Sequence, residues 1–307
     1  MYKKIVFMGT SYFAVPILKS LYQYGYPISA VYTQPPKKSN RGQKINKSPI
    51  NLFSENISLY VRTPQNLKNN NEEELYLSKL NPDLILVVSY GQIIPKNLLK
   101  IPKFGFLNVH ASLLPKWRGA APIQRSIMNL DKETGISIMK MNENLDEGPV
   151  CKKYSLEISE KMNSEELSEK LSTLASEKIL DILDNIYDGN LKFADQDHSR
   201  ATYAKKIKKS EGKIDWNEKA DQIIGKINGL YPYPGAFFMF NGERYKILKA
   251  EKSYTNGIAG NIISEDFEIC CGEGSVKVLT IQREGKKVQQ IKEFLLGSLI
   301  KKGTNIA

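Results

Sequence analysis

The stretch Asn108–Pro122 reads NVHASLLPKWRGAAP and follows an apolar run, Phe104–Val109, that is typical of a short strand. Two prolines and a glycine then break the strand into a loop. Asn108 and His110 are two residues apart, so on a strand they face the same way, although the strand could end between them. An isolated histidine is more often structural, but here the dense loop favours a site. An amide can hold an oxyanion, and an imidazole can donate to it or move a proton.

The residues before this stretch follow the order of a doubly wound α/β sheet. Lys3–Phe7 is a short apolar strand, a glycine turn follows, apolar residues recur at helical spacing from Val15, and Ile28–Tyr32 is a second strand. Asp83–Val88 is nearly all apolar, as a central parallel strand is. This order predicts a Rossmann-like, mostly parallel sheet. The first turn, GTSYFA, lacks two glycines of a dinucleotide-binding loop, so no nicotinamide cofactor is expected.

Composition narrows the class of protein. The chain has 307 residues, which is enough for two domains, and 41% of them are hydrophobic. No apolar run approaches the ~20 residues that span a bilayer. The N-terminus resembles neither a signal nor a transit segment, so a cytoplasmic protein is expected. Three cysteines without C-x-x-C spacing and two histidines indicate neither a disulfide framework nor a metal site.

The last third of the chain changes to short alternating strands. These are Ala236–Phe240, Tyr245–Ala250, Gly260–Ile263, Phe267–Cys271 and Ser275–Ile281. Asn241-Gly242 is a strong hairpin turn between the first two. The pattern predicts a small C-terminal β-barrel of the oligonucleotide-binding (OB) type. With a long amphipathic helix at Asn163–Tyr187, we expect a catalytic domain at 1–190, a linker at 191–215 and a second domain at 216–307.

Positive charge is concentrated in two places. Of the net charge of +11, residues 200–307 carry +7, which indicates either a polyanionic partner such as nucleic acid or a solvated lysine-rich surface. The polar insertion Thr33–Pro49 has five Lys or Arg and no acidic residue. Such a long loop is either a mobile surface loop or a binding loop, and its place after the second strand favours binding.

The motifs in these segments resemble one known family. N-x-H-x-S-L-L-P at Asn108–Pro115 is similar to the signature of the 10-formyltetrahydrofolate-dependent formyltransferases and hydrolases. The longer SLLPKWRGAAPIQ resembles the version in methionyl-tRNA formyltransferases. VVSYGQIIP at Val87–Pro95, the run from Thr202 to Trp216, and IQREGKKV at Ile281–Val288 are similar to further motifs of that branch. The resemblance extends from the first strand to the last.

The resemblance implies a catalytic group of three residues. Asn108 and His110 would stabilise the oxyanion formed during formyl transfer, with His110 acting as an acid or as an electrostatic donor. A purely structural role is commoner for an Asp-Glu-Gly turn, but L-D-x-G matches the family at Asp146. Asp146 would orient the imidazole and relay a proton.

The resemblance also implies binding residues and partners. The folate co-substrate, 10-formyltetrahydrofolate, would lie along two groups: Ser112, Leu113, Leu114 and Pro115; and Tyr90, Gly91, Gln92, Ile93 and Ile94. Initiator methionyl-tRNA would contact Arg41, Lys44, Arg283, Lys286 and Lys287. A monomer is expected, with no membrane partner.

Three functions remain open at this level. The first is formylation of methionine on initiator tRNA. The second is formylation of a nucleotide sugar or of glycinamide ribonucleotide, for which a basic C-terminal domain would be dispensable. The third is a tRNA-binding protein with an idle catalytic site. The basic insertion and the basic C-terminal domain favour the first over the second, and the presence of all three catalytic residues argues against the third.

Overall fold

The computed structural model describes residues 3–39 and 44–307. The chain forms two compact units, and each gathers separate segments. Unit 1 comprises Met1–Gly119, Gly135–Leu156 and Ser168–Tyr203, and unit 2 comprises Ala120–Thr134, Glu157–Leu167 and Ala204–Ala307. The chain therefore crosses between the units several times. The expected domain boundaries at residues 190 and 215 stay a prediction.

A seven-stranded sheet forms the centre of unit 1, in the order β10-β9-β7-β6-β1-β2-β5. Its strands are β1 (Ile5–Gly9), β2 (Ile28–Tyr32), β5 (Val61–Arg62), β6 (Leu84–Val88), β7 (Phe106–His110), β9 (Glu133–Lys140) and β10 (Val150–Glu157). β1 is parallel to both β2 and β6, β6 is parallel to β7, and β2 is parallel to β5. β9 is antiparallel to β7. The prediction of a mostly parallel α/β sheet is confirmed.

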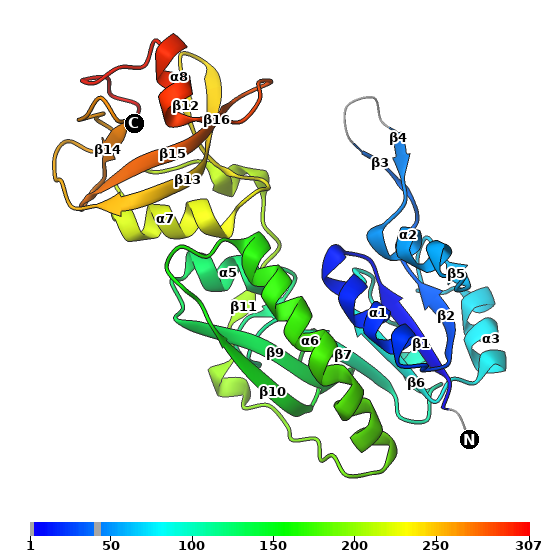
Figure 1. Cartoon of the computed structure of the whole chain (residues 1–307). Coiled ribbons are helices and arrows are strands. Elements are labelled where there is room, and N and C mark those ends of the chain that lie inside the picture. The colour runs from blue at the N-terminus through cyan, green and yellow to red at the C-terminus, as the bar shows by residue number, and fades with distance from the viewer. Residues whose placement is uncertain (1–2, 40–43) are drawn as a thin grey trace. The chain divides into compact units, whose positions relative to one another are not determined.

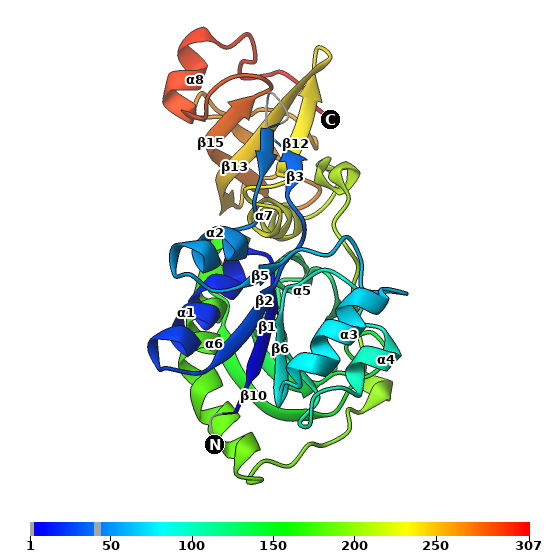
Figure 2. The same cartoon turned by 90° about the vertical axis from the view of Figure 1, so that its right-hand side faces the viewer.

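Helices cover both faces of this sheet, which explains why β1 and β6 are apolar throughout. Every residue of β1 and β6 is buried. In Figure 2, α1 (Val15–Gln23) and α6 (Ser164–Tyr187) lie on one face of the sheet, and α3 (Asn71–Leu80) and α4 (Lys96–Leu99) lie on the other. The side chains of Ser48 and Asn70 cap α2 (Pro49–Asn56) and α3 by accepting from backbone N–H groups.

The polar insertion after β2 has more structure than its sequence predicts. It contains two short antiparallel strands, β3 (Lys37–Ser39) and β4 (Lys44–Asn46), in which Lys37 lies opposite Asn46. Figure 1 labels both strands beside α2. The interpretation of the insertion as a long irregular loop is therefore wrong in part. The sequences of the two strands, KKS and KIN, contain one apolar residue between them, which is too few for an alternating pattern of apolar and polar residues. Hydrophobic periodicity therefore could not predict these strands.

Unit 2 is built on a small antiparallel sheet in the order β12-β13-β15-β14, with β16 paired to β15. Its strands are β12 (Ala236–Phe240), β13 (Glu243–Ser253), β14 (Glu268–Cys270), β15 (Ser275–Arg283) and β16 (Gln289–Gln290). The small β domain is thus confirmed, and Asn241 and Gly242 form the expected turn, with φ of 49° and 77°. The strand expected at Gly260–Ile263 is wrong, since only single bridges at Asn261 and Ile262 are present there.

The α-helices that lie wholly within unit 2 are α5 (Pro122–Met128), α7 (Ala220–Gly229) and α8 (Ile291–Gly297). An aromatic cluster, comprising Trp216, Phe238, Tyr245, Phe267 and Phe294, fills the core between sheet and helices. The rings of Phe238 and Tyr245 stack with their centroids 5.3 Å apart. A separate short pair, β8 (Arg118–Gly119) with β11 (Tyr203–Ala204), lies outside both sheets. None of the helices in 3–39 and 44–307 is long and apolar enough to cross a membrane.

Candidate active site

A group of polar side chains lies at the carboxyl ends of β1, β6 and β7. From β1 the chain proceeds outward to β2 on one side, while β6 and β7 lie on the other side. Ligands of open α/β sheets bind at such a reversal of strand order. Two hydrogen bonds tie the loops there together: Thr10 Oγ1 donates to the carbonyl of Tyr90 (2.8 Å), and Ser11 Oγ donates to Ser89 Oγ (2.9 Å).

The structure brings Asn108, His110 and Asp146 together. Asn108 and His110 lie on β7, and Asp146 lies on the loop between β9 and β10. Asn108 Nδ2 donates to Asp146 Oδ1 over 3.3 Å, and Asp146 Oδ2 lies 3.6 Å from His110 Nδ1. The backbone N–H of Gly119 also donates to Asp146 Oδ2, over 2.8 Å. One carboxylate therefore meets an amide, an imidazole and a backbone N–H.

The two ring nitrogens of His110 face different partners. Its Nε2 lies 2.9 Å from the carbonyl oxygen of Trp117, which can only accept, so Nε2 carries a proton. The other ring nitrogen, Nδ1, faces the carboxylate of Asp146. The side chains of His110 and Asp146 are only 6% and 12% exposed, so their electrostatic interaction is weakly screened by water. This arrangement can store and move one proton.

The loop that follows β7 is held by internal hydrogen bonds. Ser137 Oγ donates to the carbonyl of Ser112 (2.7 Å) and accepts from the N–H of Leu114 (3.0 Å). The side chains of Ser112 and Leu114 are fully buried. Of the four residues expected along the folate here, Leu113 and Pro115 are the half-buried ones. Ser112 and Leu114 shape the loop from within.

The loop after β6 is held by a side chain from the segment that follows β2. The amide of Gln34 donates to the carbonyls of Gly91 (2.8 Å) and Tyr90 (3.3 Å). The ring of Tyr90 and the side chain of Ile94 belong to the core, whereas Ile93 is 86% exposed. Burial raises the pKa of Tyr90 well above its usual range. Gln92 is half-buried, and its Nε2 donates to the carbonyl of Pro64. Of the five residues expected to line the folate here, only Gly91 and Ile93 are exposed.

The basic residues expected to meet tRNA lie in different places. Arg41 lies outside the described residues, and Lys44 is the first residue of β4. Arg283 ends β15 and forms an ion pair with Glu243. Lys286 and Lys287 are exposed in the turn that leads from β15 to β16.

Sequence interpretation missed two buried polar residues beside this site. Arg118 is 1% exposed and Gln196 is 7% exposed, and two guanidinium nitrogens of Arg118 donate to Gln196 Oε1 at 3.1 and 2.9 Å. Arg118 lies inside the motif after β7, and its place in that motif could have marked it as a residue of the site. Gln196 lies in a polar segment assigned to the linker, and nothing in its neighbours marks it.

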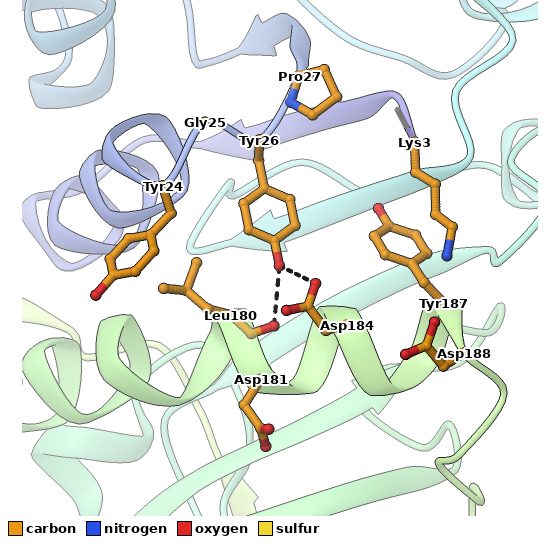
Figure 3. A pocket seen from close by; sticks show the side chains of 10 residues that line it. All are labelled: Lys3, Tyr24, Gly25, Tyr26, Pro27, Leu180, Asp181, Asp184, Tyr187 and Asp188. Carbon is orange, nitrogen blue, oxygen red and sulfur yellow. Dashed lines mark hydrogen bonds between the residues drawn. The ribbon is translucent and has the colours of Figure 1, made fainter. Parts of the chain in front are cut away.

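A separate open cavity of about 750 Å³ lies at the opposite ends of the strands, close to Lys3 and Pro27, which precede β1 and β2 (Figure 3). Tyr26 donates from its hydroxyl to Asp184 and to the carbonyl of Leu180, and Lys3 Nζ lies 4.2 Å from the ring centre of Tyr187. Burial and the carboxylate of Asp184 raise the pKa of Tyr26. This cavity lies away from the carboxyl ends of β1, β6 and β7, and we assign it no ligand.

Within the described part of the chain, no three His, Cys, Asp or Glu side chains are grouped to hold a metal ion.

Comparisons with known proteins agree with this architecture. Residues 3–183 match the family described as formyl transferase, and residues 206–299 match the formyl transferase C-terminal domain. The chain is 62% identical to the methionyl-tRNA formyltransferase of Pelagibacter ubique, over 100% of this chain and 99% of the relative. It is 42% identical to the methionyl-tRNA formyltransferase of Caldanaerobacter subterraneus, over 98% and 99% of the two chains.

Among solved structures, the fold is similar to the N-formyltransferase of Helicobacter canadensis in complex with folinic acid and dTDP-3-aminofucose. The TM-score is 0.69 at 18% identity, over 94% of this chain and 99% of that one. At this identity the likeness concerns the fold alone. The two domain matches and the full-length relatives have one consequence: the chain belongs to the methionyl-tRNA formyltransferase family.

Proposed function

We propose that this protein transfers the formyl group of 10-formyltetrahydrofolate to the α-amino group of methionine on initiator methionyl-tRNA. The product would be N-formylmethionyl-tRNA for translation initiation. The observation that carries the proposal is the buried contact of Asp146 with Asn108 and His110, in a chain that matches its methionyl-tRNA formyltransferase relatives from end to end. We place the reaction in the cytoplasm and expect the protein to act as a monomer.

The reaction forms one C–N bond and breaks another. The methionine amine attacks the formyl carbon, and the carbonyl oxygen becomes an oxyanion. Asn108 has two amide N–H donors, so one can remain on Asp146 while the other stabilises that oxyanion. His110, charged on Nδ1 and held by Asp146, adds positive charge beside it. Collapse breaks the bond from the formyl carbon to N10 of the folate, and the proton lost by the amine goes to N10 through His110 and Asp146.

We assign the folate to the two loops at the carboxyl ends of β6 and β7. The exposed parts of Tyr90–Ile94 and the half-buried Leu113 and Pro115 would contact it, while Ser112 and Leu114 hold the second loop in shape. The folinic acid in the Helicobacter canadensis complex is a formylated tetrahydrofolate, which supports a ligand of this class. We assign the tRNA to Arg41, Lys44, Arg283, Lys286 and Lys287, with residues 1–190 as the catalytic domain, 191–215 as the linker and 216–307 as the tRNA-binding domain.

The test is transfer of labelled formyl from 10-formyltetrahydrofolate to methionine-charged initiator tRNA. Parallel samples offer free methionine, glycinamide ribonucleotide and an amino-sugar nucleotide. We expect label on the charged tRNA alone. Label on a small amine would keep the folate chemistry but overturn the tRNA assignment. Folate binding without transfer to any acceptor would overturn the enzymatic assignment.

A further inference from the structure

We propose that Gln196 and Arg118 are positioning residues that clamp the loop of Asp146 against His110. The inference rests on the proposed role of Asp146 in formyl transfer. Arg118 lies on β8, and Gln196 comes from a segment, Ala194–Thr202, that precedes the second domain match in the sequence. That segment would therefore serve the active site as well as connect domains.

The loop of Asp146 needs such a constraint. It joins β9 to β10 without regular structure, and Asp146 itself has φ of 52°, in the left-handed region that aspartate tolerates better than most residues. Catalytic side chains have to stay within about 0.5 Å of their working position, and a misplacement of about 1 Å can cost roughly 100-fold in rate. Because the loop is not paired with a strand, hydrogen bonds from other segments have to hold it in place.

Gln196 supplies those bonds from its amide nitrogen. Nε2 donates to the carbonyl oxygen of Asp146 over 2.9 Å and to that of Gly148 over 2.7 Å. One nitrogen thus holds the backbone on both sides of Glu147. The two donors of a single amide group have a fixed angle between them, so both carbonyls are fixed relative to one another.

Arg118 determines which way this amide faces. Its Nε and Nη2 both donate to Gln196 Oε1, and a guanidinium cannot act as an acceptor, so the oxygen of the carboxamide must face the arginine. Nη1 lies 3.2 Å from Glu147 Oε1 and 3.3 Å from His198 Nδ1. With the amide oriented in this way, its nitrogen has to point toward the loop.

The same arginine is connected to Asp146 a second time through the backbone. Gly119, the next residue, donates its N–H to the Asp146 carboxylate. The Ala194–Thr202 segment is itself anchored at both ends. Ala194 exchanges two backbone hydrogen bonds with Val150 at 2.9 and 3.0 Å, and the carbonyl of Thr202 accepts from the N–H of Arg118 at 2.9 Å. These contacts form a closed ring that fixes both the backbone and the carboxylate of Asp146.

A purely structural role would make Gln196 only a partner for the buried guanidinium. Gln196→Glu separates the two possibilities, because a carboxylate keeps and strengthens the contact with Arg118 but cannot donate to the carbonyls of Asp146 and Gly148. Arg118→Lys is the second variant, since lysine keeps the positive charge and loses the two-pronged contact. Gln23→Glu, at the exposed end of α1, is the matched control for the added charge.

The experiment measures kcat and KM for 10-formyltetrahydrofolate and for methionyl-tRNA in each variant, alone and combined with Asp146→Asn. We expect Gln196→Glu to lower kcat about 10- to 100-fold with both KM values within about 3-fold of the parent. In the Asp146→Asn background the further loss should shrink to less than about 3-fold, because the clamp acts through the residue already changed. If Gln196→Glu does not fold, Arg118→Lys replaces it in the test. The same changes in kcat and KM, alone and with Asp146→Asn, are then expected.

Unchanged kcat in the folded variant, a rise in KM alone, or an equal proportional loss in the Asp146→Asn background would each overturn the clamp. Failure of the proposed function has a different signature. In that case the unmodified protein transfers no formyl to methionyl-tRNA, or Asp146→Asn alone leaves turnover intact.

Discussion

His110 Nδ1 lies 3.6 Å from Asp146 Oδ2, and the opposite ring nitrogen of His110 is held by the carbonyl of Trp117. The imidazole is therefore held in one orientation, in which Nδ1 meets a carboxylate. Asn108 Nδ2 and the backbone N–H of Gly119 also donate to that carboxylate. Four groups, an imidazole, a carboxylate, an amide and a backbone N–H, therefore meet at one point of the proposed active site.

Replacing any member of this group should abolish most of the turnover. We expect Asn108→Ala, His110→Ala and Asp146→Ala each to lower kcat by about 10²- to 10⁴-fold, because an oxyanion donor or a proton-transfer group is lost. The measurement is steady-state transfer of labelled formyl to methionyl-tRNA, with circular dichroism as the check on folding. Near-normal turnover in a folded variant would remove that residue from the catalytic group.

Gly148 is expected to be intolerant of any side chain. A Cβ at this position would lie 1.8 Å from the carbonyl oxygen of Lys140, so the loop that carries Asp146 would have to move. We expect Gly148→Ala to lower both kcat and the free energy of unfolding, the latter by about 1–3 kcal/mol. Gly297→Ala is the control, since a Cβ there meets nothing within 4 Å. Equal behaviour of the two variants in activity and urea unfolding would contradict the prediction.

Binding to tRNA should depend on salt through the exposed lysines after β15. Each phosphate contact contributes close to one unit to the slope of log K against log salt concentration. We expect Lys286→Ala and Lys287→Ala each to weaken binding and to reduce the slope by about one. Lys79→Ala, at an exposed position of α3, should leave the slope unchanged. Titration of labelled tRNA at several salt concentrations gives the answer, and unchanged slopes for both lysines would exclude them as phosphate contacts.

The ion pair of Arg125 with Glu211 should make the stability of unit 2 depend on pH. Hydrogen bonding from the Arg125 guanidinium, at 2.7 Å, lowers the pKa of the Glu211 carboxyl below its ordinary value despite partial burial. A lowered folded-state pKa adds stability above the unfolded-state pKa of about 4.3 and loses it as the pH falls through the folded-state pKa. Glu211→Gln should therefore be less stable than the parent at pH 7, and the difference should shrink toward pH 3.

Urea unfolding at both pH values measures this difference. Glu265→Gln removes a charge at an exposed glutamate and is the control. A difference for Glu211→Gln that stays constant between pH 7 and pH 3 would show that the ion pair is not the cause.

The three cysteines should be unreactive in the folded protein. All three are free thiols, and burial raises the pKa of Cys151 to about 11 and that of Cys271 to about 12. Burial also raises the pKa of Cys270. Because the thiolate is the nucleophile, alkylation by iodoacetamide at pH 7.5 should be slow in the native state and complete in urea. Rapid labelling of the native protein, read by mass spectrometry, would contradict this expectation.

Local patterns in the sequence were enough for most of the regular structure. The apolar run at Leu84–Val88 predicts a central strand because a parallel strand is buried on both faces, and Asn241-Gly242 predicts its hairpin because both residues adopt positive φ readily. Helices α7 and α8 and the β3–β4 pair were not predicted, and the strand at Gly260–Ile263 was predicted wrongly. α7 packs against β13 and α8 against β15, and such packing helps to decide the conformation of a short segment. β3 and β4 pair with each other, and their residues lack the alternating apolar pattern that would predict a strand.

What the sequence determined by itself was the order of the elements in unit 1 and the placing of Asn108 and His110 on one strand, since period and spacing are local properties of the chain. The resemblance pointed to Asp146 as the third member, but only the tertiary structure shows the contact and the residues that hold Asp146 there. Asp146 reaches the histidine because Gln196 and Arg118, from two other segments, hold its loop by hydrogen bonds. Hydrogen bonds between segments depend on distance in space, and a single sequence records only distance along the chain.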